Sequence, residues 1–321
     1  MDCRIICKRL RREFNISAGV LLIYYAVMNV AVYLVAFLDA FLRILEEVRI
    51  SGWGTVTAEK ILAKTVDNGW GYILAIATAF LCMILWKKRS FCFVEIWKSN
   101  RPMKFGAFWA ILCIFISGQA FVQLYADGLE WLLNHFGLSV YEAIAAVSGG
   151  SNSISMFLYG ALFAPVFEEI LFRGLILKTL MPTGKKFAIF ASAFFFGMFH
   201  GNIVQTPFAF ALGLVLGYVA TEYSLVWAIG LHMINNLVIG EVLPYVLAPL
   251  PVMGQEVIYN AINWGCAIAA LIICICRWRQ IKQYLFENRM QPLCFGVFFS
   301  APVVLVFTGV MLLNIFLFFL H

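Results

Sequence analysis

The chain alternates between long apolar stretches and short polar joints, and this pattern predicts its architecture. A helix that crosses a hydrocarbon core of about 30 Å needs about 20 mostly apolar residues. By that measure we predict nine spanning helices, near residues 17–42, 69–86, 105–125, 153–177, 187–203, 206–221, 224–240, 256–276 and 293–320. The pattern therefore predicts an all-α, polytopic transmembrane helix bundle.

The fifth, sixth and seventh of these spans are separated by very short joints. Residues 201–206 form one joint, and Glu222 with Tyr223 forms the next. We leave open that one of the three spans is a re-entrant or broken helix packed against its neighbours, which would leave eight spans. No repeat, low-complexity tract or polar linker divides the sequence, so we expect residues 1–321 to form a single membrane domain.

The composition agrees with this class of protein. Hydrophobic residues make up 63% of the chain and charged residues 12%, against roughly 45–50% and 25% in soluble domains. The formal net charge is +6. Because the basic residues are scattered over four segments, we expect the lipid bilayer as a partner and no nucleic acid.

Lysine and arginine fall mainly on one side of the predicted spans. With the N-terminus inside, 18 of the 23 basic residues lie in inner segments. These are Arg4, Lys8, Arg9, Arg11, Arg12, Lys87, Lys88, Arg89, Lys98, Arg101, Lys104, Lys178, Lys185, Lys186, Arg277, Arg279, Lys282 and Arg289. Cytoplasmic segments carry such an excess. We therefore predict a cytoplasmic N-terminus, with residues 1–16 as a basic cytoplasmic segment, and a C-terminus outside.

Residues 165–177 place three ionisable side chains inside a stretch that is otherwise apolar enough to span a bilayer. One such residue at a helix centre costs about 2.5–3.5 kcal/mol, so a functional explanation is the default. Glu169 and Arg173 are four residues apart and share a helix face, which predicts an ion pair. Glu168 is rotated about 100° away and is left over. The alternative is that both carboxylates clamp the arginine and only stabilise the bundle.

Two later spans carry histidines at lipid depth. Phe196-x-x-x-His200 lies in the fifth predicted span and His232-x-x-x-Asn236 in the seventh. His232 and Asn236 share one helix face at this spacing, with Asn235 about 100° off it. At 1.5 Å of rise per residue, these groups and the glutamate pair lie about 12–19 Å from the inner ends of their helices. The pattern therefore predicts a polar chamber near mid-membrane.

Together, these motifs resemble those of the CAAX protease and bacteriocin-processing family of intramembrane endopeptidases, which includes the type II CAAX prenyl endopeptidases. The resemblance covers about residues 154–240, which we take as the catalytic core. It implies hydrolysis of a peptide bond in a membrane-associated protein or peptide, without a covalent acyl-enzyme. The catalytic residues that it implies are Glu168, His200, His232 and Asn236, with Glu169, Arg173 and Phe196 in support.

The chemistry of the residues is compatible with glutamate-dependent hydrolysis. The Gly-x-Ser-x-Gly motif of serine hydrolases is absent from the sequence. With His200 beside it, Glu168 can take a proton from water, which makes water the nucleophile. His232 and Asn236 can hold the oxyanion of the tetrahedral intermediate.

A zinc site is an alternative reading of the same residues. Two histidines and two glutamates can ligate Zn²⁺ and leave a position open for water. The His-Glu-x-x-His arrangement of many metalloproteases is absent from the sequence. Since the resemblance favours a metal-independent site, we expect no cofactor.

Two non-enzymatic functions remain as alternatives, a scaffold or immunity protein of the same family and a proton-coupled transporter. Every motif position is filled, which argues against an inactive relative, and the lack of repeat symmetry argues against a transporter. The resemblance implies a CAAX-type, bacteriocin or signal-peptide-like substrate. Short loops favour a bacterial relative in the cell membrane, acting on a membrane-embedded or lipid-modified substrate. The sequence leaves the substrate and the oligomeric state open.

Overall fold

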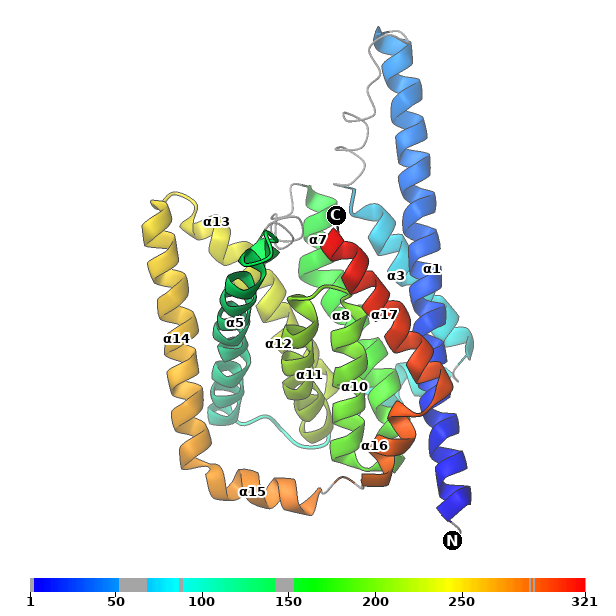
Figure 1. The fold of residues 1–321 in the computed structure, drawn as a ribbon, viewed down its shortest axis with the longest axis vertical. Helices are drawn as coiled ribbons and strands as arrows, with labels where there is room; N and C mark the ends of the chain where they lie inside the picture. Colours follow the sequence, from blue (N-terminus) through cyan, green and yellow to red (C-terminus); the bar gives the residue numbers. More distant parts are fainter. Residues whose placement is uncertain are drawn as a thin grey trace.

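The computed structural model describes residues 3–51, 68–86, 89–141, 153–288, 290 and 292–320, and every regular element in these ranges is a helix (Figure 1). The elements are α1 (Cys3–Ser51), α3 (Trp70–Trp86), α4 (Arg89–Phe93), η2 (Glu95–Trp97), α5 (Phe105–Asn134), α7 (Ile154–Leu158), η3 (Tyr159–Phe163), α8 (Ala164–Glu169), η4 (Ile170–Leu177), α9 (Lys178–Leu180), η5 (Met181–Thr183), α10 (Lys185–Phe199), α11 (Gln205–Glu222), α12 (Leu225–Met233), η6 (Ile234–Val242), α13 (Leu243–Leu247), α14 (Val252–Cys276), α15 (Trp278–Glu287), α16 (Pro292–Phe299) and α17 (Pro302–Leu320). The chain is a polytopic helical bundle, as predicted.

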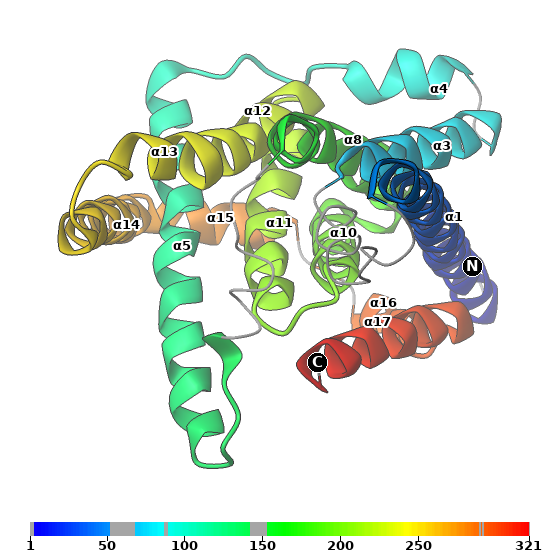
Figure 2. The ribbon, with the colours of Figure 1, turned by 90° about the horizontal axis from the view of Figure 1, so that it is seen from above.

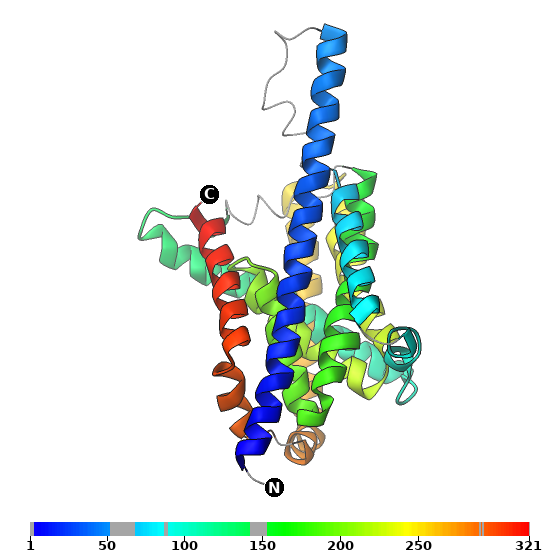
Figure 3. The ribbon, with the colours of Figure 1, turned by 90° about the vertical axis from the view of Figure 1, so that its right-hand side faces the viewer.

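The helices α10 and α11 pack against each other at the centre of this bundle. Seen from above, α1, α3, α16 and α17 lie on one side of them, and α5 and α14 lie on the other (Figure 2). Figure 3 shows α1 running along the whole bundle and projecting beyond it. Its 49 residues extend about 73 Å at 1.5 Å of rise per residue, more than twice the hydrocarbon thickness of about 30 Å. Part of α1 must therefore leave the membrane.

Phenylalanine rings fill the core around α10. The Phe187 ring lies 5.3 Å from Phe14 of α1 and 5.7 Å from Phe298 of α16. Further along α10, Phe195 lies 5.2 Å from Phe307 of α17 in an edge-to-face contact. Such pairs contribute about 0.5–1.5 kcal/mol beyond the burial of their area. They hold α10, whose far end carries one of the predicted site histidines, against both ends of the chain.

Fewer helices cross the membrane than predicted. Among the described residues, five are long and apolar enough to cross it, or six if a bent C-terminal pair is one span, so the prediction of nine was wrong. Three predicted spans form α3, α10 and α11, which have 17, 15 and 18 residues. These lengths give about 22–27 Å, short of the hydrocarbon core of about 30 Å. The positions of these three helices along the chain were predicted correctly. The prediction that each of them crosses the membrane was not supported.

The bent pair lies in the last predicted span. The segments Leu293–Phe299 and Pro302–Leu317 meet at 62°. Proline lacks an N–H and is favoured in the first turn of a helix, which explains why the second segment begins at Pro302. Asn15 of α1 accepts a hydrogen bond from the backbone N–H of Val303 at 3.0 Å. The N-terminal helix thereby caps the start of α17.

Three stretches of wider, π-helical winding interrupt the helices that carry the predicted site. They are η3 and η4 in the helix of the glutamates and η6 after α12. Pro165 follows η3 and Pro244 follows η6, each within the first two positions of the next α-helical segment. A proline removes one helical hydrogen bond and crowds the preceding turn. Wider winding relieves this conflict, and such turns are frequent at functional sites.

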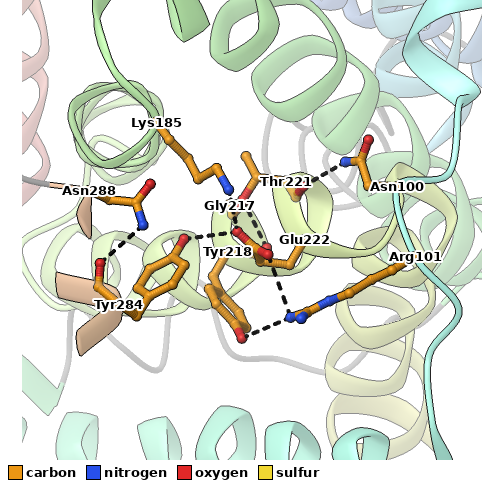
Figure 4. A network of polar contacts seen from close by, with 9 residues as sticks. All are labelled: Asn100, Arg101, Lys185, Gly217, Tyr218, Thr221, Glu222, Tyr284 and Asn288. Carbon is orange, nitrogen blue, oxygen red and sulfur yellow. Dashed lines mark hydrogen bonds and ion pairs between the residues drawn. The ribbon is translucent and has the colours of Figure 1, made fainter. Parts of the chain in front are cut away.

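A polar clasp joins four segments at the end of the bundle that carries α15 (Figure 4). Glu222 Oε1, at the end of α11, accepts hydrogen bonds from Lys185 Nζ at 2.7 Å and from the Tyr284 hydroxyl at 3.1 Å. Its Oε2 lies 3.5 Å from Arg101 Nη2. Burial and the neighbouring Glu222 carboxylate raise the pKa of Tyr284 above its ordinary value. The clasp holds α15 and the segment before α5 against the two central helices.

Candidate active site

Two adjacent glutamates end α8 with different exposure. The Glu169 side chain is 0% exposed, whereas the Glu168 side chain is 24% exposed. Neighbouring residues of a helix point about 100° apart, so one carboxylate enters the core and the other stays accessible. This is the division between a paired and a spare glutamate that the helical spacing predicted.

The predicted ion pair between Glu169 and Arg173 is present. Arg173 Nη1 lies 2.7 Å from Glu169 Oε1, and both side chains are fully buried. The guanidinium also lies over the Phe196 ring, with Cζ 4.1 Å from the ring centroid. A charge-assisted hydrogen bond and a cation–π contact thus stabilise the buried arginine together. The pair forms a rigid support for the groups around it.

The imidazole of His232 lies between the two glutamates. Its Nδ1 is 3.0 Å from Glu169 Oε1, and its Nε2 is 3.9 Å from Glu168 Oε2. An ionised carboxylate only accepts hydrogen bonds, so Nδ1 donates to Glu169 and Nε2 is left facing Glu168. The packing of α12 against α8 creates this contact between residues 63 positions apart.

His200 is the C-cap of α10 and follows Phe196 by four residues. Its Nδ1 donates to the Phe196 carbonyl at 2.8 Å, which leaves Nε2 for other partners. The Phe196 ring is 4.8 Å from the His200 ring and 5.8 Å from that of His232. Gly201 follows with a φ of 59°, the left-handed conformation with which glycine ends a helix.

Asn236 lies in the π-helical stretch η6 and bonds to a different part of the glutamate helix. Its Nδ2 donates to the Gly160 carbonyl in η3 at 3.0 Å, and its Oδ1 accepts from Asn235 Nδ2 at 3.1 Å. Asn235 in turn accepts a hydrogen bond from Gln119 of α5 at 2.8 Å. The amide of Asn236 is therefore held from two sides.

The structure brings six of the seven predicted residues into one contact network. These six are Glu168, Glu169, Arg173, Phe196, His200 and His232. Asn236 bonds instead to the backbone of η3 and to its neighbour Asn235. Sequence reasoning missed Gln119 and Gly160. A glutamine inside the apolar span 105–125 was a usable signal for the first, but no local pattern marked the second.

Gly213 of α11 allows the buried arginine to fit. A Cβ atom there would lie 3.2 Å from Arg173 Nη2 and 3.1 Å from the Cα of Ala193. We expect Gly213→Ala to lower thermal stability in detergent by about 1–3 kcal/mol, the usual range for overpacking. Gly265→Ala is the matched control, because a Cβ at this glycine in α14 meets nothing within 4 Å. Equal melting temperatures for the two variants would refute tight packing at Gly213.

The zinc alternative gains no support from the described residues. Among them, no group of three or more His, Cys, Asp or Glu side chains is arranged to hold a metal ion. His232 Nδ1 and His200 Nδ1 each donate a hydrogen bond, as the outer ring nitrogen of a metal-bound histidine commonly does, so these two bonds do not decide the question. We therefore derive no step through a metal.

Comparison with known proteins identifies the central segment. Residues 150–238 match the family described as type II CAAX prenyl endopeptidase Rce1-like. The matched segment covers less than a third of the 321 residues and contains all seven predicted site residues. The family resemblance that the three motifs indicated is therefore confirmed. No curated protein and no solved structure matches the chain.

Proposed function

We infer from the Rce1-like type II CAAX prenyl endopeptidase domain at residues 150–238 that the chain is an intramembrane protease. We further propose that it hydrolyses a peptide bond with water activated by a glutamate and a histidine. The observation that carries this proposal is the position of His232, 3.0 Å from a fully buried Glu169 and 3.9 Å from a partly exposed Glu168. One carboxylate orients the imidazole, and the other remains available to water.

In the proposed first step, Glu168 takes a proton from water while the water oxygen attacks the scissile carbonyl carbon. The Glu168 side chain is the accessible member of the glutamate pair, so water can reach it. His200 has its Nδ1 fixed by the Phe196 carbonyl, which leaves Nε2 to orient the same water. The proton then passes to the leaving amine as the carbon–nitrogen bond breaks, giving a carboxylate and an amine.

The tetrahedral intermediate needs donors for its oxyanion, and we propose His232 and Asn236. The Nδ1–H of His232 donates a hydrogen bond to Glu169, so Nε2 can donate only when the ring carries a proton on both nitrogens. The buried Glu169 lies where it can stabilise that charged ring. Asn236 Nδ2 carries two hydrogens, and the Gly160 carbonyl accepts one of them. The second hydrogen is the donor that the oxyanion would use.

The topology that we propose follows from the placement of the basic segments. The N-terminus and α15 lie at the same end of the bundle in Figure 1, and the clasp adds Arg101 and Lys185 to that end. An excess of Lys and Arg marks the cytoplasmic side. We place this end in the cytoplasm of a bacterial cell, with the C-terminus outside. The substrate would be a membrane-embedded or lipid-modified peptide or protein.

Replacing His200 by Ala tests the proposed function. We expect the variant to lose about 10²-fold in cleavage, since acid–base groups supply roughly 10²–10⁴-fold. The measurement is mass spectrometry of newly exposed protein termini in membranes of cells that carry the wild type, the variant or neither. His135→Ala is the control, because His135 caps α5 and its side chain bonds only to the Trp131 carbonyl among the described contacts.

Termini that require the wild type and fall in the His200 variant establish a protease and show its substrate class. The same termini in all strains, with both proteins present in the membrane, would favour a scaffold or a transporter instead. A transporter would then be tested by substrate-dependent proton flux in proteoliposomes.

A further inference from the structure

Three side-chain amides form a directed relay from α5 to the proposed site. Gln119 Nε2 donates to Asn235 Oδ1 at 2.8 Å, and Asn235 Nδ2 donates to Asn236 Oδ1 at 3.1 Å. The relay ends where Asn236 Nδ2 donates to the Gly160 carbonyl at 3.0 Å. Every link therefore runs in the same direction, from an amide nitrogen to the next carbonyl oxygen.

The middle link joins neighbouring residues within the π-helical stretch η6. Adjacent side chains on an α-helix point about 100° apart and do not face each other. Asn235 and Asn236 lie in the π-helical stretch that begins at Ile234. A π-helix has more residues per turn, so the rotation between neighbours is smaller. The two amides can then bond to each other while the first also reaches α5.

The relay settles which way the Asn236 amide faces. An asparagine amide can be turned over, which exchanges its oxygen and its nitrogen. Asn235 offers a donor to the oxygen, and Gly160 offers an acceptor to the nitrogen. Turning the amide over would place Asn236 Nδ2 against Asn235 Nδ2, which are both donors. It would also place Asn236 Oδ1 against the Gly160 carbonyl, which are both acceptors. The Gly160 carbonyl can only accept, so it sets the direction of every link, and the Gln119 amide then holds Asn235 in that orientation by donating to its oxygen from α5.

We propose that Gln119 and Asn235 are positioning residues that orient the Asn236 amide toward the oxyanion. This inference rests on the proposed function, since it assumes that Asn236 donates to the tetrahedral intermediate. It extends the catalytic unit to α5, which lies outside the segment that matches the protease family. Neither Gln119 nor Asn235 touches the substrate in this role. Both act through Asn236.

A second amide pair on the same helix provides the matched control. Gln123 Nε2, four residues after Gln119 on α5, donates to Asn260 Oδ1 of α14 at 3.3 Å. This pair also joins two helices through amides, but its described contacts do not lead to the site. Hydrogen bonds of this kind between membrane helices contribute little to stability on average. A merely structural role therefore predicts similar small effects at Gln119 and Gln123.

The experiment is a double-mutant cycle between Gln119→Met and Asn236→Ala. The readout is the initial rate at which wild-type-dependent termini appear in cell membranes. We expect Asn236→Ala to lower this rate by about 10²–10³-fold, as loss of an oxyanion donor does. Gln119→Met alone should lower it by about 10-fold, because the amides beyond it lose their fixed direction. The double variant should match Asn236→Ala alone, because a relay cannot position an amide that is absent.

Asn235→Ala tests the relay from its second member and is the substitute if Gln119→Met does not fold. It should also be without further effect in the Asn236→Ala background.

Two results would overturn the inference. One is that the losses of cleavage rate in Gln119→Met and Asn236→Ala multiply in the double variant. The other is that Gln119→Met and Gln123→Met cleave at equal rates. If no newly exposed protein terminus requires both the wild-type protein and its His200 side chain, the proposed function fails and this inference fails with it. If such termini exist but the cycle is additive, only this inference fails.

Discussion

Replacing Glu168 by Gln is expected to lower cleavage by about 10³-fold or more while the protein stays folded. The amide keeps the shape of the side chain but cannot take a proton from water, and acid–base groups supply roughly 10²–10⁴-fold. A carboxylate within the membrane costs about 2.5–3.5 kcal/mol, so its removal should leave Tm unchanged or higher. Rates of terminus formation and thermal unfolding in detergent measure the two effects.

The matched control for this variant is Glu256→Gln, which removes an exposed carboxylate from α14. It should retain wild-type cleavage. A Glu168→Gln protein that still cleaves at the wild-type rate would eliminate the proposed mechanism. A Glu168→Gln protein that is inactive because it unfolds would show instead that this carboxylate holds the bundle together, the structural alternative for the motif.

Replacing Arg173 by Met is expected to destabilise the protein by about 3–5 kcal/mol, the cost of breaking a buried ion pair by removing one partner. Glu169 would keep a buried charge with His232 as its remaining described partner. The Phe196 ring would also lose the guanidinium above it. Thermal unfolding in detergent measures the change.

Arg43→Met is the matched control, because Arg43 and Asp39 form an ion pair with the same spacing of four residues and the same distance of 2.7 Å. Their side chains are 34% and 19% exposed, and such pairs contribute about 0.2–1 kcal/mol. If Arg173→Met and Arg43→Met lose comparable thermal stability, burial adds nothing to the strength of the Glu169–Arg173 ion pair. The double variant Glu169→Gln, Arg173→Met should recover much of the stability, since it leaves no unpaired charge.

The part of the site that lies within one helix could be predicted from the sequence. Glu169 and Arg173 pair because side chains four residues apart meet on any α-helix. Glu168 stays outside that pair for the same geometric reason. The motif order also placed His200 in the fifth predicted span and His232 in the seventh, and the family match at residues 150–238 agrees with this order.

The predicted geometry of Asn236 assumed an unbroken α-helix. In the structure the helix widens from Ile234 onward, and Asn236 bonds to Gly160 and Asn235. Pro244, which follows the widened stretch, was a visible signal for this change. The count of spans failed for a related reason. Apolar composition placed α10 and α11 correctly, but it did not determine how many membrane-spanning helices the chain has.

The sequence by itself determined the helical membrane class, the approximate positions of helices such as α10 and α11, and the ion pair between Glu169 and Arg173. These properties depend on hydrophobicity and on spacing along a single helix, which act over a few residues. Only the tertiary structure decided that His232 reaches both glutamates and that Gln119 connects α5 to Asn236. Such contacts depend on which helices pack together and at what rotation. Packing sums many weak interactions between distant segments, and no local pattern encodes it.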